Sequence, residues 1–199
     1  MKLIFASNNQ HKIDELKAFA GKEIEIFSLK DAGIDIDIPE PHNTLEENAS
    51  EKSRAIYQLT GDDCFSEDTG LEIEALNGEP GVKSARYAGD ARSFKDNIEK
   101  VLNKLANKTT RKARFRAVIS LIIGGNETQF EGICNGKIID SPIGTEGFGY
   151  DPIFIPDGSE RSFAEMSIEE KNQFNHRTKA AAKLVAFLQT IKTNSTNWA

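Results

Sequence analysis

The sequence of 199 residues has no long hydrophobic run and only two cysteines. No stretch approaches the roughly 18 apolar residues that a membrane-spanning helix needs. The start, MKLIFASNN, becomes polar too early for a secretory signal peptide, so we expect a cytoplasmic protein without a membrane partner. Cys64 and Cys134 form no CxxC pair or zinc-type cluster, and their apolar surroundings favour reduced core residues.

An excess of positive charge is also absent, because 25 Lys and Arg residues face 31 Asp and Glu residues for a net charge of −6. Proteins that bind nucleic acid generally carry a basic face, so the composition argues against such a partner. A small anionic substrate remains compatible, because a few cations and a metal ion can build a local positive site. With 38% hydrophobic and 28% charged residues, and no linker or repeat, residues 1–199 predict a single soluble domain.

Apolar periodicity places short strands and amphipathic helices in alternation up to residue 107. Gly21 is placed to end the first helix, and Gly61 to end the second. In the third helix, Phe94 and Ile98 are expected to face inward with Val101, Leu102 and Leu105. The expected strands cover residues 2–6, 23–29, 63–66 and 71–76, and the expected helices cover residues 11–20, 44–60 and 93–107.

A change of period after residue 112 indicates longer strands. Residues 113–123 alternate strictly, as in a half-buried strand, and GGNE turns the chain into a second strand at 128–134 and a third through Ile139. A loop at 141–157, a closing helix at 177–191 and a frayed tail at 193–199 follow. The sum predicts an α/β protein in which two lobes share a mixed sheet flanked by helices. The long antiparallel strands fall in the second lobe, and a cleft lies between the lobes.

Two positions on the first two helices combine polar side chains with a lysine. Ser7–Lys12 (SNNQHK) joins a strand to a helix, where backbone N–H groups can bind an anion, although an ordinary N-cap is the alternative. Lys52 interrupts the apolar stripe of the second helix one turn after Asn48, so it points into a polar cleft or snorkels from the core. Glu47 fits a capping box with Thr44.

Acidic and glycine-rich segments supply further candidates. Ser66–Gly70 (SEDTG) places adjacent carboxylates at a strand end, which suits a divalent metal or water activation, or else a plain Asp/Gly turn. Glu40 could supply a second ligand. In GTEGFGYDP, Phe148 could stack on a base, or the segment is a packed turn. Lys171 and the pair His176–Arg177 could contact phosphate or a base edge, although a histidine there could also be a surface residue.

Taken in order, these segments resemble the inosine triphosphate pyrophosphatase family, also described as dITP/XTP or non-canonical purine NTP pyrophosphatases. The resemblance covers about residues 3–190. Asn8 stands where many members have glycine, and Thr69 where serine is common. The matching segments are SNNQHK (7–12), DIPE (37–40), the Glu47-Asn48-Ala49…Lys52 helix, SEDTG (66–70), EPGVKSARYAG (79–89), GFGYDPIF (147–154) and Ser167…Lys171…His176-Arg177.

The resemblance implies Mg²⁺-dependent hydrolysis of ITP, dITP and XTP to the monophosphate and pyrophosphate, by a homodimer. It implies that Asp68 is the general base and a metal ligand, with Glu40 as second ligand and Glu47 and Glu67 as further acidic candidates. His176 and Arg177 would donate to the 6-carbonyl of the base. The residues implied in substrate binding are Ser7, Asn8, Asn9, Gln10, His11, Lys12, Lys52, Thr69, Phe148, Gly149, Tyr150, Asp151, Lys171, His176 and Arg177.

Two other functions compete with this one. A pyrophosphatase for modified pyrimidine nucleotides opens with a similar polar turn, but the GFGYDPIF segment and the Lys171…His176-Arg177 cluster favour purines. A non-catalytic nucleotide sensor would keep the pocket, yet the presence of both Asp68 and Glu40 argues against it.

Overall fold

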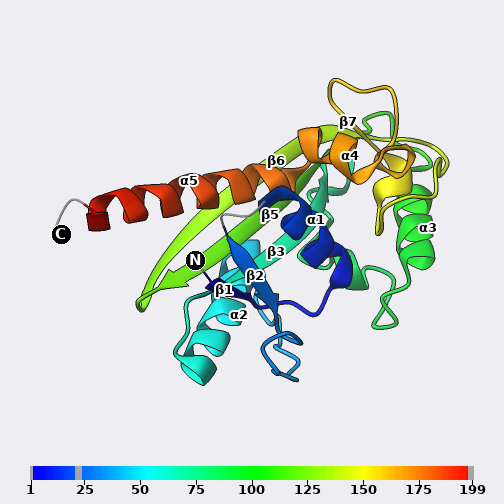
Figure 1. Ribbon diagram of the computed structural model, residues 1–199. Coiled ribbons are helices and arrows are strands. Elements are labelled where there is room, and N and C mark those ends of the chain that lie inside the picture. The colour runs from blue at the N-terminus through cyan, green and yellow to red at the C-terminus, as the bar shows by residue number, and fades with distance from the viewer. Residues whose placement is uncertain (1, 21–23, 197–199) are drawn as a thin grey trace. The chain divides into compact units, whose positions relative to one another are not determined.

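The computed structural model describes residues 2–20 and 24–196, with side chains at 2–19 and 24–191. It is a mixed α/β protein with a mixed sheet flanked by helices, as the sequence predicts (Figure 1). The chain divides into two compact units. Unit 1 consists of Met1–Asp68, Val118–Gly132 and Arg177–Ala199, and unit 2 consists of Thr69–Ala117 and Ile133–His176. Both the single-domain prediction and the predicted position of the cleft stay predictions.

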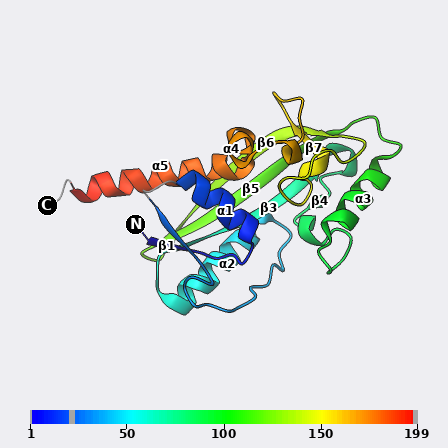
Figure 2. The ribbon, with the colours of Figure 1, turned by 45° about the vertical axis from the view of Figure 1, so that its right-hand side comes forward.

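Unit 1 contains the parallel part of the sheet. β1 pairs with β2 on one side and with β3 on the other, parallel to both. Helices α1 and α5 lie on one face of these strands and α2 on the other (Figures 1 and 2). Because helices cover both faces of the sheet here, the strand β1 (KLIF) is almost continuously apolar. The elements are β1 (Lys2–Phe5), α1 (Gln10–Ala20), β2 (Glu25–Ser28), α2 (Leu45–Thr60), the start of β3 (Cys64–Ile73) and α5 (His176–Thr196).

The ends of α2 follow the predicted capping signals. The Thr44 side chain accepts a hydrogen bond from the backbone N–H of Glu47, which satisfies one of the orphan donors of the first turn. Gly61 takes a left-handed conformation at φ +74°, and its N–H donates to the carbonyl of Tyr57. Gly21, expected to end α1, lies outside the described residues.

Unit 2 has an aromatic core. The ring of Phe115 lies 4.7 Å from that of Phe154 in an edge-on contact, and Phe163 packs against both. The elements are the remainder of β3, η1 (Glu74–Leu76), β4 (Pro80–Gly81), η2 (Ser84–Arg86), α3 (Phe94–Leu105), β5 (Lys112–Ile123), β6 (Asn126–Ile138), η3 (Asp151–Ile153), β7 (Phe154–Pro156), η4 (Phe163–Glu165) and α4 (Ile168–Phe174); β5 and β6 also run into unit 1.

The predicted turn at SEDTG is wrong, because β3 runs unbroken from Cys64 to Ile73. Gly70 serves a close approach rather than a turn. A Cβ built there would lie 2.6 Å from the carbonyl oxygen of Gly81 on the neighbouring strand β4. Glu67 and Asp68 therefore lie within a strand, where consecutive side chains point to opposite faces of the sheet.

Three further expectations are corrected. The strand expected to begin after Cys134 does not exist separately, because β6 continues through Ile138. Phe94 is 45% exposed instead of facing inward. Fraying is expected for residues 193–199, but α5 continues to Thr196, and residues 197–199 lie outside the described residues. Helix α4 and strand β7 are short elements without a full period of apolar residues, and the sequence pattern did not indicate them.

The strands β5 and β6 form a hairpin closed by Gly124 and Gly125, both with positive φ. The strict alternation predicted for β5 holds as far as Arg116. From Ala117 to Ile122 both faces are buried. Apolar side chains on both faces are needed there because helices cover the sheet in unit 1.

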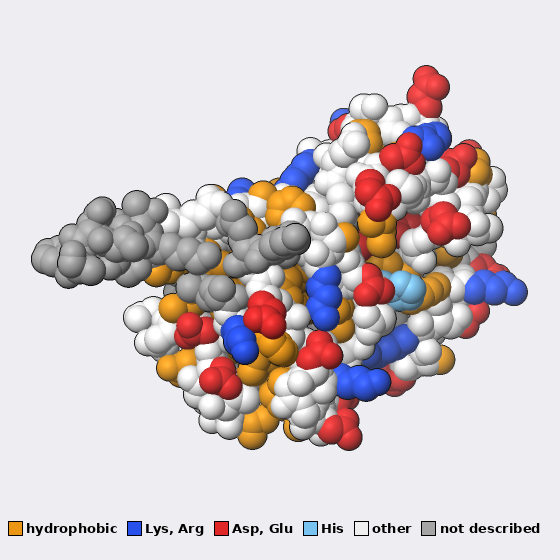
Figure 3. Space-filling view, in the orientation of Figure 1, with side chains coloured by type: hydrophobic (Ala, Val, Ile, Leu, Met, Phe, Trp, Pro, Cys, Tyr) orange, Lys and Arg blue, Asp and Glu red, His pale blue; other side chains and the backbone are white. Residues whose placement is uncertain are grey.

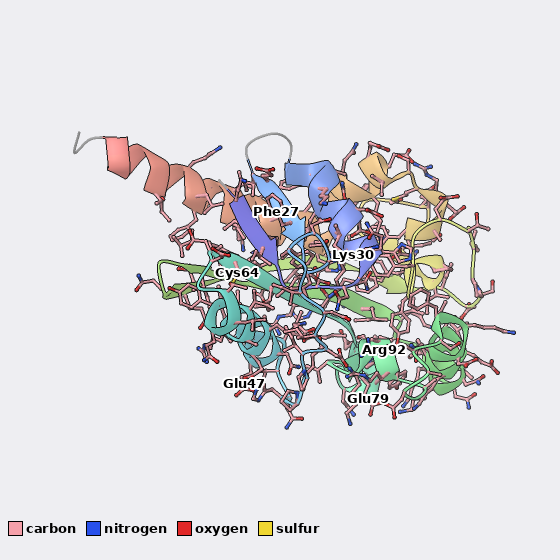
Figure 4. All side chains as sticks on the ribbon, turned by 60° about the horizontal axis from the view of Figure 1, so that its bottom comes forward. Phe27, Lys30, Glu47, Cys64, Glu79 and Arg92 are labelled. Atoms are coloured by element: carbon pink, nitrogen blue, oxygen red, sulfur yellow. The ribbon has the colours of Figure 1, made fainter. Side chains whose placement is uncertain are left out.

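Both cysteines are free and buried, as predicted, and Cys64 is labelled in Figure 4. No helix among the described residues is both long enough and apolar enough to cross a membrane. On the face shown in Figure 3, Lys and Arg side chains are interspersed with Asp and Glu side chains and form no broad basic patch.

Candidate functional site

A lysine held between two carboxylates forms the centre of the site in unit 1. Lys52 Nζ lies 2.6 Å from Oε1 of Glu40 and 3.1 Å from Oδ1 of Asp68, and it donates to the carbonyl oxygen of Glu67 at 2.9 Å. The Lys52 side chain does not snorkel to the surface, since the residue is only 7% exposed. Burial acts to lower the pKa of Lys52, but Asp68 and Glu40 outweigh it and raise that pKa, so the ammonium stays charged.

Asp68 is buried beside this lysine, and burial raises the pKa of its carboxyl above the ordinary aspartate value. The positive charges of Lys52 and Lys12 act in the opposite direction but do not cancel the effect of burial. A raised pKa makes the carboxylate a stronger base than an exposed aspartate. This property suits a group that takes a proton from an attacking water.

A second lysine approaches the same strand. Lys12 Nζ lies 3.6 Å from Oε1 of Glu67 and 3.5 Å from the Glu67 carbonyl oxygen. Burial lowers the pKa of Lys12, and Glu67 partly offsets that effect. The carbonyl oxygen of Glu67 therefore accepts hydrogen bonds from both Lys12 and Lys52. The structure thus brings together the two lysines that the sequence predicted for binding the triphosphate.

Arg177 is bound by carboxylates inside unit 1. Its guanidinium donates to Glu67 at 2.7 and 3.2 Å and also bonds to Glu15. The residue is 1% exposed. The sequence predicted Arg177 at the edge of a base, but this geometry favours a role in holding Glu67, and the contact with a base stays a prediction. Glu15 was not a candidate in the sequence, although a glutamate one residue before Leu16 on a buried helix face is the signal that could have found it.

The polar turn before α1 adopts the ordinary helix-capping geometry. The Asn9 side chain accepts from the backbone N–H of Lys12 at 3.3 Å, and Ser7 Oγ accepts from the N–H of Asn9 at 3.2 Å. The Asn8 side chain donates to the carbonyl of Ile36. Gln10 and His11, on the first turn of α1, are exposed. These contacts place the turn at the carboxyl end of β1, and an anion-binding role for it stays a prediction.

Glu47 has a structural explanation. Its carboxylate accepts from the Thr44 hydroxyl at 2.8 Å, and its side chain is exposed at the start of α2 (Figure 4). Thr44 caps the helix in return. Glu67 is fully engaged with Arg177 and Lys12. Of the acidic candidates, Glu40 and Asp68 are therefore the two best placed to hold a cation together.

In unit 2, Asp151 organises the glycine-rich segment. Its Oδ2 atom accepts from Lys171 Nζ at 2.6 Å and from the backbone N–H of Phe148 at 2.9 Å. Lys171 Nζ also lies 5.0 Å from the centre of the Phe148 ring. Gly147 has φ +74°, and a Cβ there would collide with the Asp151 carboxylate. These contacts fix the loop around Phe148, as the packed-turn alternative predicts. The Phe148 ring itself is half-buried, so part of it stays accessible.

The remaining candidates of unit 2 have definite places. The Tyr150 hydroxyl donates to the carbonyl of Ser84 at 2.8 Å, and burial raises the pKa of that hydroxyl. His176 is 4% exposed and stacks on Phe115, with ring centres 4.9 Å apart, so it is no surface residue. Gly149 has φ +61°, and Thr69 is half-buried directly after Asp68 on β3.

Comparison with known proteins decides the family. The model of the Ham1 family matches residues 3–187. The chain belongs to the Ham1 family. It is 49% identical over 189 residues to a protein of Flavobacterium psychrophilum named dITP/XTP pyrophosphatase, covering 95% of this chain and 100% of that protein. The family to which the sequence motifs pointed is thereby confirmed.

Solved structures of the family have the same fold. The Staphylococcus aureus Ham1 protein is 41% identical and superposes with a TM-score of 0.86 over 96% of this chain and 99% of that one. The HAM1 protein of Coxiella burnetii is 35% identical with a TM-score of 0.87 and the same coverage.

Glu67 provides a test of the buried ion pairs in this Ham1 protein. Burial acts to raise its pKa, but Arg177 and Lys12 outweigh burial and hold the pKa below the ordinary value of 4.5. Glu67 therefore stabilises the fold above about pH 4.5, and the contribution is lost as the pH falls through its folded pKa. We expect Glu67→Gln to lower the free energy of unfolding by about 3 kcal/mol at pH 7.

Urea unfolding of both proteins between pH 3 and pH 7 measures this effect. The difference between wild type and variant should shrink below pH 4.5. Glu25→Gln, at an exposed position of β2, is the matched control and should unfold like the wild type at every pH. A Glu67→Gln difference that stays constant across the range would contradict the assigned ion pairs.

Proposed function

We propose that this Ham1-family chain is a Mg²⁺-dependent pyrophosphatase for the non-canonical purine nucleotides ITP, dITP and XTP. It would cleave between the α- and β-phosphates and release a monophosphate and pyrophosphate, removing deaminated purines from the nucleotide pool. The observation that carries the proposal is Lys52 held between the carboxylates of Glu40 and Asp68. The name dITP/XTP pyrophosphatase, given to relatives 48–49% identical, supports the substrate class.

Different residues of the site would bind the triphosphate, activate the attacking water and position the lysines. Lys52 and Lys12 supply positive charge for the triphosphate, and the start of α1 offers backbone N–H groups nearby in sequence. Asp68 orients the attacking water and takes its proton, for which its raised pKa suits it. Glu67 holds both lysines through its carbonyl oxygen.

Glu40 and Asp68 are the two residues that would hold a magnesium ion. Both carboxylates converge on the same ammonium group, within 2.6 and 3.1 Å, so their oxygens can also converge on one cation. Magnesium sites of this type use one or two carboxylates together with substrate phosphates. When bound, the ion would neutralise charge on the departing pyrophosphate.

Selection of the base follows from hydrogen-bond chemistry in unit 2. Hypoxanthine and xanthine carry an acceptor at position 6, where adenine carries an amino donor. A donor from buried His176 would pair with the former and be left unsatisfied by adenine. Arg177 would have to leave Glu15 and Glu67 to reach a base, so we assign it a positioning role. The Phe148 ring would stack on the base. The homodimer and the cytoplasmic location stay predictions.

One assay tests the proposed function. We expect pyrophosphate release from ITP, dITP and XTP with kcat/KM about 5- to 150-fold above that for ATP, because one unsatisfied buried donor costs about 1–3 kcal/mol. GTP should also react more slowly, but guanine shares the 6-carbonyl acceptor and would have to be rejected at its 2-amino group. The measurement is pyrophosphate release across the nucleotide panel with Mg²⁺, including modified pyrimidine nucleotides. Equal turnover of ATP and ITP would contradict the proposed selectivity for deaminated purines. Preference for a pyrimidine nucleotide would favour the pyrimidine pyrophosphatase, and nucleotide binding without turnover would favour a sensor.

A further inference from the structure

Phe94 is an exposed aromatic residue beside the glycine-rich segment of unit 2, residues 144–152, here termed the base loop because Phe148 is proposed to meet the base. It is the first residue of α3 and is 45% exposed, whereas the rest of the apolar stripe of this helix is buried or half-buried. The exposure of one apolar residue is not unusual by itself, so what matters is what the Phe94 ring contacts. Its ring centre lies 6.3 Å from that of Phe148, with the two planes tilted by 47°.

Hydrogen bonds connect the base loop, through residues 84–88, to the helix α3 that carries Phe94. The Tyr150 hydroxyl ties the base loop to the carbonyl of Ser84 at 2.8 Å. The buried side chain of Asn97 accepts from the N–H of Ala88 at 2.7 Å and donates to the carbonyl of Ala85 at 3.1 Å. The EPGVKSARYAG segment is therefore bound to the base loop on one side and to α3 on the other.

The start of α3 is fixed as well. The Ser93 side chain accepts from the backbone N–H of Asp96 and caps the helix immediately before Phe94. Phe94 is thus the first residue of a capped helix, and its ring lies beside that of Phe148, whose backbone N–H donates to Asp151. The contact of the two rings is a second connection between α3 and the base loop, besides the one through Tyr150, η2 and Asn97.

We propose that Phe94 is a positioning residue for nucleotide binding, which holds the Phe148 ring at the tilt needed to stack on a purine. The two rings are tilted rather than stacked, so Phe94 does not lie flat on a face of the Phe148 ring as a stacked base would. Lys171 Nζ also lies over the same ring, 5.0 Å from its centre, in a cation–π contact. The inference rests on the proposed function, because Phe148 is taken to meet the base.

The test compares Phe94→Ala with wild type in pyrophosphate release from ITP. We expect KM to rise about five- to tenfold, as for the loss of one aromatic pair, while kcat changes less than about twofold. Phe94→Tyr should restore KM, because it keeps the ring. Leu59→Ala, at an apolar residue on α2 of unit 1 that is 58% exposed, is the matched control and should behave as wild type.

Two measurements separate positioning from a general structural effect. In a Phe148→Ala background, Phe94→Ala should leave KM unchanged, because residues that act through one another are not additive. The inhibition constant of inorganic tripolyphosphate, which has no base, should be the same in wild type and Phe94→Ala. An unchanged KM, an additive double variant or an equal loss for tripolyphosphate each overturns the inference.

A failure of the proposed function can be distinguished from a failure of the inference about Phe94. Wild-type protein would then release no pyrophosphate from ITP. In that event the dissociation constant of ITP replaces KM in the same variant series, and a five- to tenfold weakening confined to Phe94→Ala would still support the contact. Equal dissociation constants for wild type and Phe94→Ala would reject it.

Discussion

Replacing Asp68 with asparagine is expected to reduce kcat for pyrophosphate release by about a thousandfold while ITP still binds. The amide has the size of the carboxylate but cannot take a proton from water. Lys52 keeps Glu40 as an ion-pair partner at 2.6 Å, so the fold and the positive charge for the phosphates should survive. The measurements are steady-state pyrophosphate release and the dissociation constant of ITP.

The control for this variant separates a base from a metal ligand. If Asp68 only bound Mg²⁺, a high Mg²⁺ concentration would restore much of the rate of Asp68→Asn, whereas loss of the base is not repaired by metal. Asp62→Asn, an exposed residue before β3, should have wild-type kinetics. Wild-type turnover of Asp68→Asn would remove Asp68 from the role of base.

Removal of Mg²⁺ should have the second large effect. With a chelator in excess we expect pyrophosphate release to fall to background, and added Mg²⁺ to restore it. Glu40→Gln should raise the Mg²⁺ concentration needed for half-maximal activity at least about tenfold, since even groups that only support a ligand change metal affinity by about 10- to 100-fold. A titration of activity against Mg²⁺ measures this.

Glu47→Gln is the matched control for the metal site. Its carboxylate accepts from the Thr44 hydroxyl at the start of α2, apart from the Glu40–Lys52–Asp68 contacts. The variant should need the same Mg²⁺ concentration as wild type. If Glu47→Gln shifted the requirement and Glu40→Gln did not, the proposed pair of ligands would be wrong.

Periodicity and capping signals predicted much of the fold because they act over a few residues. Thr44 and Gly61 bound α2 where expected, and the glycine pair at 124–125 closes the β5–β6 hairpin. These features depend on local backbone conformation, which neighbouring side chains decide.

The errors arose where distant segments decide the outcome. An Asp-Thr-Gly sequence suggests a turn, yet Gly70 is needed because the β4 backbone passes beside it. Phe94 fits the apolar period of α3, yet it lies at the helix start, where the neighbouring residue is Phe148 rather than the core. Neither neighbour is close in sequence, so no local pattern could reveal it.

The sequence by itself determined the family and the set of chemical groups. Two lysines, two carboxylates and a glycine-rich aromatic segment are recognised by residue type and order, and neither property needs coordinates. Only the tertiary structure decided which groups meet. It joined Lys52 to Glu40 and Asp68, and it bound Arg177 to Glu15 and Glu67 within a buried ion cluster. A buried charge must find an opposite charge wherever the chain brings one near, and that choice is made by packing across as many as 162 residues of sequence.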